Sequence, residues 1–171
     1  MTAIRDARPG DRPAILAVTL AAYEQYADTL TPASWTMYRR NIQATLADVG
    51  PAAQIVAEDE GGLLGAVLLF PAGAVMENPG IASVALECPE VRLLAVAPTA
   101  RGKGVARALM DECLRRAQAA GASAVTLHTA DMMAVAMQLY ERMGFARAPE
   151  LDLRPAPEIL AKGYKRMLPR S

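Results

Sequence analysis

The sequence has few of the residues that build metal centres and disulfide frameworks. Of its 171 residues, two are cysteines and one is a histidine. Cys88 and Cys113 have neither the spacing of a disulfide framework nor that of metal ligands, and a single histidine argues against a zinc site. We therefore expect two free thiols and no bound metal.

An excess of charge of either sign is also missing. Lysine and arginine together number 18, aspartate and glutamate together number 18, and the formal net charge is zero. This balance excludes the broad positive field of a general nucleic-acid-binding protein, so any anion site must be local. At 53% hydrophobic and 21% charged residues, the composition is that of an ordinary globular protein.

Long hydrophobic runs are absent as well. One of the longest, LLGAVLLF at residues 63–70, is far shorter than the roughly 20 residues that span a bilayer. The N-terminal stretch reaches charged residues at Arg5 and Asp6 before any apolar segment, which is not the pattern of a secretory signal. We expect a cytoplasmic protein with no membrane partner.

Apolar periodicity and turn residues predict strands that alternate with helices, hence a single α/β domain over residues 1–171. The three prolines of residues 71–89 leave that segment unassigned, as a long loop or the entry to a strand. Strands are predicted at 2–7, 54–58, 63–70, 90–96, 124–129, 145–153 and 164–168, and helices at 11–26, 31–49, 105–120 and 131–143.

The stretch VRLLAVAPTARGKGVARALM, residues 91–110, has the order strand, glycine-containing basic loop, helix. This order is typical of an anion cradle. A Walker A loop is excluded because Lys103 is followed by Gly104, and a dinucleotide fingerprint is weak because Arg107 replaces its third glycine. The alternative that remains is a solvated basic helix start on a surface loop.

Two motifs in this chain resemble those of the GNAT superfamily of acetyl-CoA-dependent N-acetyltransferases. RGKGVA at residues 101–106 matches [R/Q]-x-x-G-x-[G/A], and AMQLYERMGF at residues 136–145 matches A-x-x-x-Y-x-x-x-G-F. The close resemblance covers residues 90–145. It implies an α/β fold with a mixed, mostly antiparallel sheet of six to seven strands, a splayed central parallel pair and about four helices.

The resemblance also implies that acetyl-CoA is the co-substrate, with no metal. In this family the backbone N–H groups of the first motif hold the pyrophosphate of coenzyme A, and the strand before it pairs with the pantetheine arm. Carried over to this chain, the pantetheine would pair with Leu94, Ala95 and Val96, and the pyrophosphate would lie against Arg101, Gly102, Lys103, Gly104, Val105 and Ala106.

The implied reaction is direct transfer of the acetyl group to a primary amine of a small molecule or peptide. A lysine-like ammonium, with a pKa of about 10.4, must first lose a proton. The resemblance suggests Glu90 as the general base, Tyr140 as the acid that protonates the leaving sulfur, and the Leu94 N–H as oxyanion donor. The alternatives are an exposed carboxylate at a strand start and a tyrosine that packs helix against sheet.

Three other residues bear on the predicted site. Many relatives have asparagine at the position of Met133, where it helps bind the cofactor arm, and methionine cannot make that hydrogen bond. His128 could act as a base, but a structural role is favoured. A covalent route through Cys88 is disfavoured because direct transfer is the family norm.

The acceptor remains unidentified by sequence. In this fold the acceptor pocket is usually formed by the first two helices and the last strands, where the candidates are Tyr23, Tyr26, Trp35, Asp152 and Glu158. A longer acyl donor is one alternative, and a catalytically silent acyl-CoA-binding module is another. On family grounds a homodimer is plausible, although the residues themselves do not show it.

Overall fold

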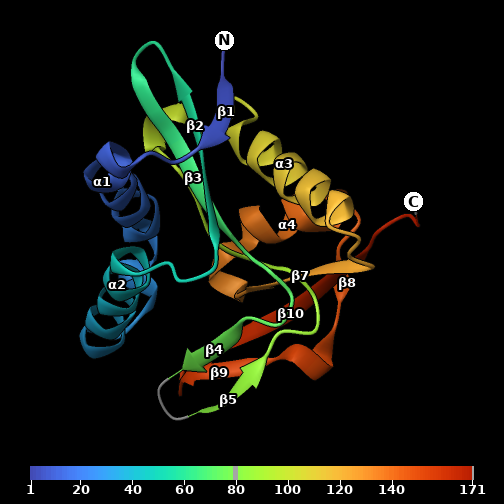
Figure 1. The fold of residues 1–171 in the computed structure, drawn as a ribbon. Coiled ribbons are helices and arrows are strands. Elements are labelled where there is room, and N and C mark those ends of the chain that lie inside the picture. Colours follow the sequence, from blue (N-terminus) through green and yellow to red (C-terminus); the bar gives the residue numbers. More distant parts are fainter. Residues whose placement is uncertain (79–80, 171) are drawn as a thin grey trace. The chain divides into compact units, whose positions relative to one another are not determined.

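A computed structural model of the chain describes residues 1–78 and 81–170, and Figure 1 shows its elements in chain order. The residues form two compact units. The first comprises Met1–Leu69 and Leu93–Cys113, and the second comprises Phe70–Arg92 and Leu114–Ser171. The prediction of one domain stays a prediction.

The first unit is built on antiparallel strands. β1 (Ala3–Asp6) pairs with β2 (Ala53–Asp59), which forms a hairpin with β3 (Gly62–Phe70), and β6 (Glu90–Val96) is the next strand after β3. The hairpin turns at Gly61 and Gly62 as predicted, and the Asp59 carboxylate accepts a hydrogen bond from the Gly61 N–H at 2.8 Å.

Three helices belong wholly or partly to this unit: α1 (Arg12–Tyr23), α2 (Pro32–Ala47) and the first part of α3 (Val105–Ala119). α1 contacts α2, and Ile15 of α1 packs with Val56 and Ala66 of the sheet. α2 begins as predicted, because the Thr31 hydroxyl caps the Ser34 N–H.

Aspartate often caps a helix through its side chain, but Asp11 does not. Asp11 precedes α1, but its side chain makes no cap hydrogen bond to that helix. Its carboxylate accepts hydrogen bonds from the Arg5 guanidinium and from the Arg8 N–H instead, at 2.7 Å each. Arg5 also donates to Glu58, so one guanidinium joins β1, β2 and the turn before α1.

The second unit contains the parallel pair. The start of β6 runs parallel to β7 (Ala124–Thr129), with Glu90 opposite Thr126 and Val91 opposite Leu127. β7 pairs antiparallel with β10 (Ile159–Met167), which also pairs with β8 (Ala146–Arg147) and β9 (Leu153–Ala156). The predicted mixed, mostly antiparallel sheet with one parallel pair is confirmed, whereas its splaying stays a prediction.

Three segments of this unit differ from the sequence prediction. In the unassigned segment, β4 (Val75–Asn78) pairs antiparallel with β5 (Ile81–Ala85). The predicted strand at 145–153 is interrupted by a 3-10 helix at Pro149–Leu151, and β9 carries Pro155. The last predicted helix is a 3-10 turn at Asp131–Met133 followed by α4 (Ala134–Arg142).

Candidate functional site

Strand β6 contains a backbone feature that the sequence did not predict. Leu93 has a φ of 51°, in the left-handed region that residues other than glycine rarely adopt. It directly precedes Leu94, Ala95 and Val96, the residues expected to pair with pantetheine. A left-handed residue inside a strand interrupts the regular ladder and turns the next peptide group, as a bulge does. The strain, about 1–3 kcal/mol, is typical of functional sites.

The residues after Leu93 are held in place by contacts within the first unit. The Tyr23 hydroxyl donates to the Leu94 carbonyl at 3.4 Å, and the Ala97 N–H donates to the Leu64 carbonyl at 2.8 Å. Ala95 is buried. Tyr23, one of the acceptor-pocket candidates, therefore lies against the strand that is expected to meet the thioester.

Tyr23 is part of a half-buried aromatic cluster on α1, α2 and the turn between them. Its ring centroid lies 5.8 Å from that of Tyr26 and 5.9 Å from that of Tyr38, and Trp35 stacks on Tyr38 at 6.4 Å. Burial raises the pKa of Tyr26 and, more strongly, that of Tyr38. Both phenols therefore stay protonated near neutral pH, which excludes them as bases.

The loop at residues 101–106 has the backbone of an anion cradle. Gly102 and Gly104 have φ values of 75° and 77°, which glycine alone adopts without strain. The first backbone hydrogen bond of α3 runs from the Ala108 N–H to the Gly104 carbonyl. The N–H groups of the preceding residues point out of the helix start, where the helix dipole favours an anion.

Cationic side chains surround this loop. Arg101, Lys103 and Arg107 are all exposed at the start of α3. The Arg107 guanidinium lies 3.6 Å from the Asp111 carboxylate one turn along the helix, so part of its charge is compensated. Arg101 and Lys103 therefore supply most of the formal charge that a pyrophosphate would meet.

Glu90, the candidate base, lies in a buried ion cluster of the second unit. Its side chain is 2% exposed, so the alternative of an exposed carboxylate is wrong. The Arg92 Nε–H donates to Glu90 Oε2 at 2.6 Å, and His128 Nδ1 lies 3.1 Å from Glu90 Oε1. His128 Nε2 lies 2.7 Å from the Leu151 carbonyl oxygen. Sequence analysis did not predict that Glu90 and His128 pair.

The cluster shifts the titration of both partners. Burial alone raises the pKa of Glu90, but the hydrogen bond from His128 and the charge of Arg92 outweigh it, and the net pKa is lowered. Burial lowers the pKa of His128, but the Glu90 carboxylate and the Leu151 carbonyl outweigh it, and the net pKa is raised. The proton between them therefore resides on the imidazole.

These opposite shifts predict a stability optimum. The His128 contribution is complete below its ordinary pKa of 6.5 and is lost as the pH rises through the higher folded value. The Glu90 contribution is present above its ordinary pKa of 4.5 and is lost as the pH falls through the lower folded value. We expect wild type to melt at a higher temperature than His128→Asn, with the largest difference between pH 4.5 and pH 6.5. Each kcal/mol of lost stability should lower the melting temperature by about 2–4 °C. Scanning calorimetry across pH 4–9 measures this difference, and a pH-independent difference would contradict it.

Tyr140 occupies the buried face of α4. It is 6% exposed, and its ring packs edge-on against Phe145 with the centroids 6.0 Å apart. Gly144, with a φ of 87°, follows the end of α4 and lies between Tyr140 and Phe145 in the sequence. Met133, which replaces the usual asparagine, precedes α4 as its cap residue and is half-buried.

Two of the acceptor-pocket candidates lie in the second unit. The Asp152 carboxylate is held by Arg147 at 2.7 and 2.9 Å and by the Gly163 N–H at 2.8 Å. The hydrogen bond from Arg147 lowers the pKa of Asp152 to about 2. Its charge is already compensated, so it is a poor attractant for a cationic amine. Glu158 is exposed near the β9–β10 turn.

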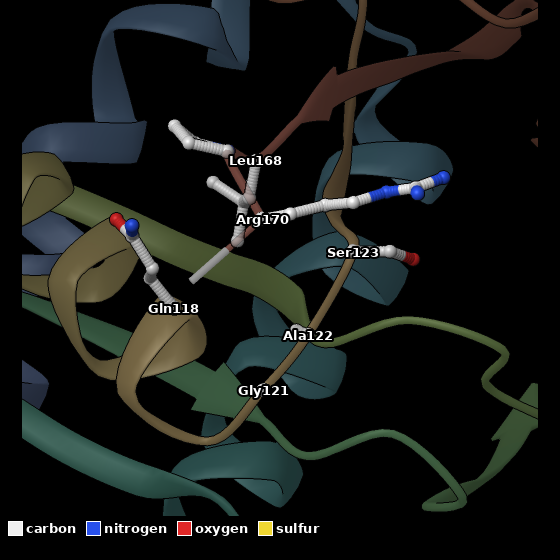
Figure 2. Close-up of a pocket in the computed structure, with 7 residues that line it drawn as sticks. Gln118, Gly121, Ala122, Ser123, Leu168 and Arg170 are labelled. Atoms are coloured by element: carbon white, nitrogen blue, oxygen red, sulfur yellow. The ribbon is translucent and has the colours of Figure 1, made fainter.

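A surface hollow of about 290 Å³ lies elsewhere, beyond the C-terminal end of α3 (Figure 2). Among the described residues of its lining, Arg170 has the one charged side chain, and no carboxylate, histidine or tyrosine is present to act as a general base. The lining residues are Gln118, Gly121, Ala122, Ser123, Leu168, Pro169 and Arg170. Within residues 1–78 and 81–170, no helix is long and apolar enough to cross a bilayer.

Comparisons with known proteins agree with these motifs. The model of the acetyltransferase (GNAT) family matches residues 19–145. The IAA acetyltransferase of Azospirillum brasilense is 41% identical over 69 residues, which cover 40% of this chain and 45% of that protein. The chain spans about half the length of the curated relatives it matches.

Solved structures share the fold over almost the whole chain. A GNAT-family acetyltransferase from Staphylococcus aureus superposes with a TM-score of 0.75 at 14% identity, covering 99% of this chain and 100% of that one. The PaiA N-acetyltransferase from Thermoplasma acidophilum, in complex with coenzyme A, gives 0.69 at 14% identity, covering 98% and 99%. The predicted fold is confirmed, and the chain belongs to the acetyltransferase (GNAT) family.

Proposed function

We propose that the protein transfers the acetyl group of acetyl-CoA to a primary amine of a small molecule or peptide. The observation that carries this proposal is the backbone of residues 93–104. Left-handed Leu93 precedes the strand segment expected to meet the thioester, and left-handed Gly102 and Gly104 precede a 15-residue helix. A thioester on a pyrophosphate-bearing carrier needs both features, one for each end of the donor.

The residues of the loop fit the donor's pyrophosphate. Backbone N–H groups at a helix start bind phosphate oxygens, and Arg101 and Lys103 add two exposed positive charges. A Cβ atom built on Gly102 or Gly104 would have no neighbour within 4 Å. The space beside both glycines is therefore free of other protein atoms.

In the proposed reaction the neutral amine nitrogen attacks the thioester carbonyl carbon, and the carbon–sulfur bond then breaks. Tyr140 donates its phenolic proton to the leaving thiolate. The proton lost by the amine passes through water to the Glu90 carboxylate, because Glu90 is buried and direct contact with the amine is blocked. The products are an N-acetylated amine and coenzyme A with a free thiol.

The test is a thiol-release assay with acetyl-CoA and a panel of primary amines and peptides. We expect release that depends on one class of amine, with mass spectrometry showing the acetylated product. Longer acyl-CoA donors in the same assay test the chain length. Absence of release with every amine, in a protein that binds acetyl-CoA, would contradict the proposal.

A catalytically silent acyl-CoA-binding module is the second candidate. The observation that favours it is the compensation of Glu90 by Arg92 and His128, which leaves the candidate base weakly basic. A silent module would bind acetyl-CoA and coenzyme A equally well and release no thiol with any amine. An active enzyme would consume the bound acetyl-CoA once its acceptor is added.

Changing Gly104 to alanine should weaken donor binding. An alanine at a φ of 77° costs about 1–2 kcal/mol, so the loop relaxes and its N–H groups turn away from the phosphates. The dissociation constant for coenzyme A, measured by calorimetry, is expected to rise about 5- to 30-fold.

Gly121→Ala is the matched control for this change. Gly121 has a φ of 80° and no neighbour within 4 Å of its would-be Cβ, but it follows the other end of the same helix. We expect a similar loss of stability with an unchanged dissociation constant. Equal effects of the two variants on coenzyme A binding would refute the cradle.

A further inference from the structure

His128 is the only histidine of the chain, and both of its ring nitrogens lie at hydrogen-bonding distance from an oxygen acceptor. Nδ1 lies 3.1 Å from the Glu90 carboxylate, and Nε2 lies 2.7 Å from the Leu151 carbonyl. Both oxygens are hydrogen-bond acceptors, so each ring nitrogen must donate a hydrogen bond to be satisfied. A neutral imidazole carries a single N–H and would leave one nitrogen lone pair facing an oxygen lone pair.

A proton moved from the imidazole to Glu90 would also satisfy both contacts, but the surroundings oppose it. The Arg92 Nε–H donates to the other carboxylate oxygen at 2.6 Å, which stabilises the charged carboxylate. Asp152 lies close enough to His128 to feel its charge, although its own carboxylate is held by Arg147. The positive charge of Arg92 acts directly against an imidazolium, but the Glu90 carboxylate and the Leu151 carbonyl outweigh it.

The imidazolium joins three segments that are far apart in sequence. Glu90 starts β6, His128 lies near the end of β7, and Leu151 ends the 3-10 helix between β8 and β9. That 3-10 helix packs so closely on β10 that a Cβ atom built on Gly163 would lie 2.4 Å from the Leu151 Cβ. The side chain next to it in sequence, Asp152, is clasped by Arg147.

We propose that His128, in its doubly protonated form, is the positioning residue that fixes both the Glu90 carboxylate and the β8–β9 connection for acyl transfer. The catalytic part of this inference rests on the proposed function. His128 acts through Glu90 and Leu151 rather than on the substrate. Its side chain is 19% exposed, so it exchanges protons with solvent. Loss of one proton at high pH leaves only one of its two hydrogen bonds in place.

The charge state is measured by NMR. In 15N-labelled protein the single imidazole gives one pair of ring nitrogen resonances. We expect both nitrogens to be protonated at pH 6 and to titrate at a higher pH than an unfolded histidine. Glu90→Gln should lower the midpoint by about one pH unit or more, whereas Glu87→Gln, which alters an exposed carboxylate three residues away, should leave it unchanged. A non-protonated ring nitrogen at pH 6 would overturn the proposal.

Amide hydrogen exchange measures how firmly His128 holds the β8–β9 connection, and it does not depend on enzymatic activity. The N–H groups of Leu151, Asp152 and Gly163 are hydrogen-bonded within or beside the 3-10 helix. At pH 6 these amides should exchange about tenfold faster in His128→Asn than in wild type, since a hydrogen bond to a charged group is lost. The difference should shrink as the pH rises through the histidine midpoint. Equal protection at every pH would overturn this part.

The link to the reaction is measured with the acceptor amine found in the thiol-release assay. Asparagine keeps a donor near Glu90 but does not titrate. The wild-type to His128→Asn ratio of rates at each pH cancels the ionisation of the amine. We expect the ratio to fall about tenfold as the pH rises through the NMR midpoint. A flat ratio would overturn the positioning role, whereas a protein without thiol release would refute the proposed function and leave the NMR and exchange results to decide the charge and the hold.

Discussion

Replacing Tyr140 with phenylalanine is expected to lower the turnover of thiol release by about 10- to 100-fold. The change removes the hydroxyl and keeps the ring, so the edge-on contact with Phe145 at 6.0 Å is preserved. Without the phenol, the leaving thiolate must take its proton from water. The effect should therefore fall on turnover, and the dissociation constant for coenzyme A should change little.

The matched control for Tyr140 is Tyr164, a second buried tyrosine of the same unit. Tyr164 is 2% exposed, and its hydroxyl donates to Glu141 at 3.3 Å. Tyr164→Phe removes the same atom from a comparable environment on β10. We expect normal turnover in this variant. If Tyr164→Phe and Tyr140→Phe lose turnover equally, or if Tyr140→Phe loses stability in proportion to its activity, then Tyr140 is a packing residue and the assigned proton donor is wrong.

The parts of the site that sequence analysis predicted depend on local residue types. The loop at residues 101–106 needs left-handed backbone at two positions, and glycine is the residue that provides it, so the sequence pattern and the φ values agree. The turn at Gly61 and Gly62 and the Thr31 cap of α2 likewise depend on local residue types, and they lie where the predicted strands and helix begin or end. Each depends on residues within a few positions of one another.

The parts that were missed depend on contacts between distant residues. Whether Glu90 meets His128 is decided by the register of β6 on β7, in which Glu90 lies opposite Thr126. A one-residue slip in that register would turn the facing side chains to the other face of the sheet. Leu93 shows the same limit, because no propensity assigns a left-handed conformation to leucine.

The wrong predictions of secondary structure have related causes. The apolar pattern at residues 145–153 resembles one strand, but Asp152 is hydrogen-bonded to Arg147 and to the Gly163 N–H, and a 3-10 helix replaces the middle of the strand. The helix predicted from residue 131 begins as a 3-10 turn, and the Asp131 carboxylate pairs with Lys162 of β10. In both cases the carboxylate is held in an ion pair, which the apolar pattern of the sequence does not indicate.

Gly65 is a second residue of the first unit, after Leu93, whose importance sequence analysis did not indicate, and Gly65→Ala is expected to lower both stability and donor affinity. A Cβ at this position would lie 2.6 Å from the Ala95 carbonyl oxygen, 3.1 Å from Val105 Cγ1 and 3.2 Å from Leu109 Cδ1. The first of these atoms is backbone, so no rotamer change relieves the clash. We expect a cost of about 1–3 kcal/mol, measured by denaturant unfolding.

The same clash should reach the donor site, because two of the three residues that the Cβ would meet are parts of that site. Ala95 belongs to the strand segment expected to pair with pantetheine, and Val105 is the first residue of α3. Displacing either changes the distance between the β6 backbone and the cradle, so coenzyme A affinity should fall even where the protein is fully folded. Gly10→Ala is the control: Gly10 lies in the same unit and has no neighbour within 4 Å of its would-be Cβ. If Gly65→Ala loses stability but binds coenzyme A as tightly as Gly10→Ala does, then the spacing of β6 and α3 does not set donor binding, and the cradle alone holds the donor.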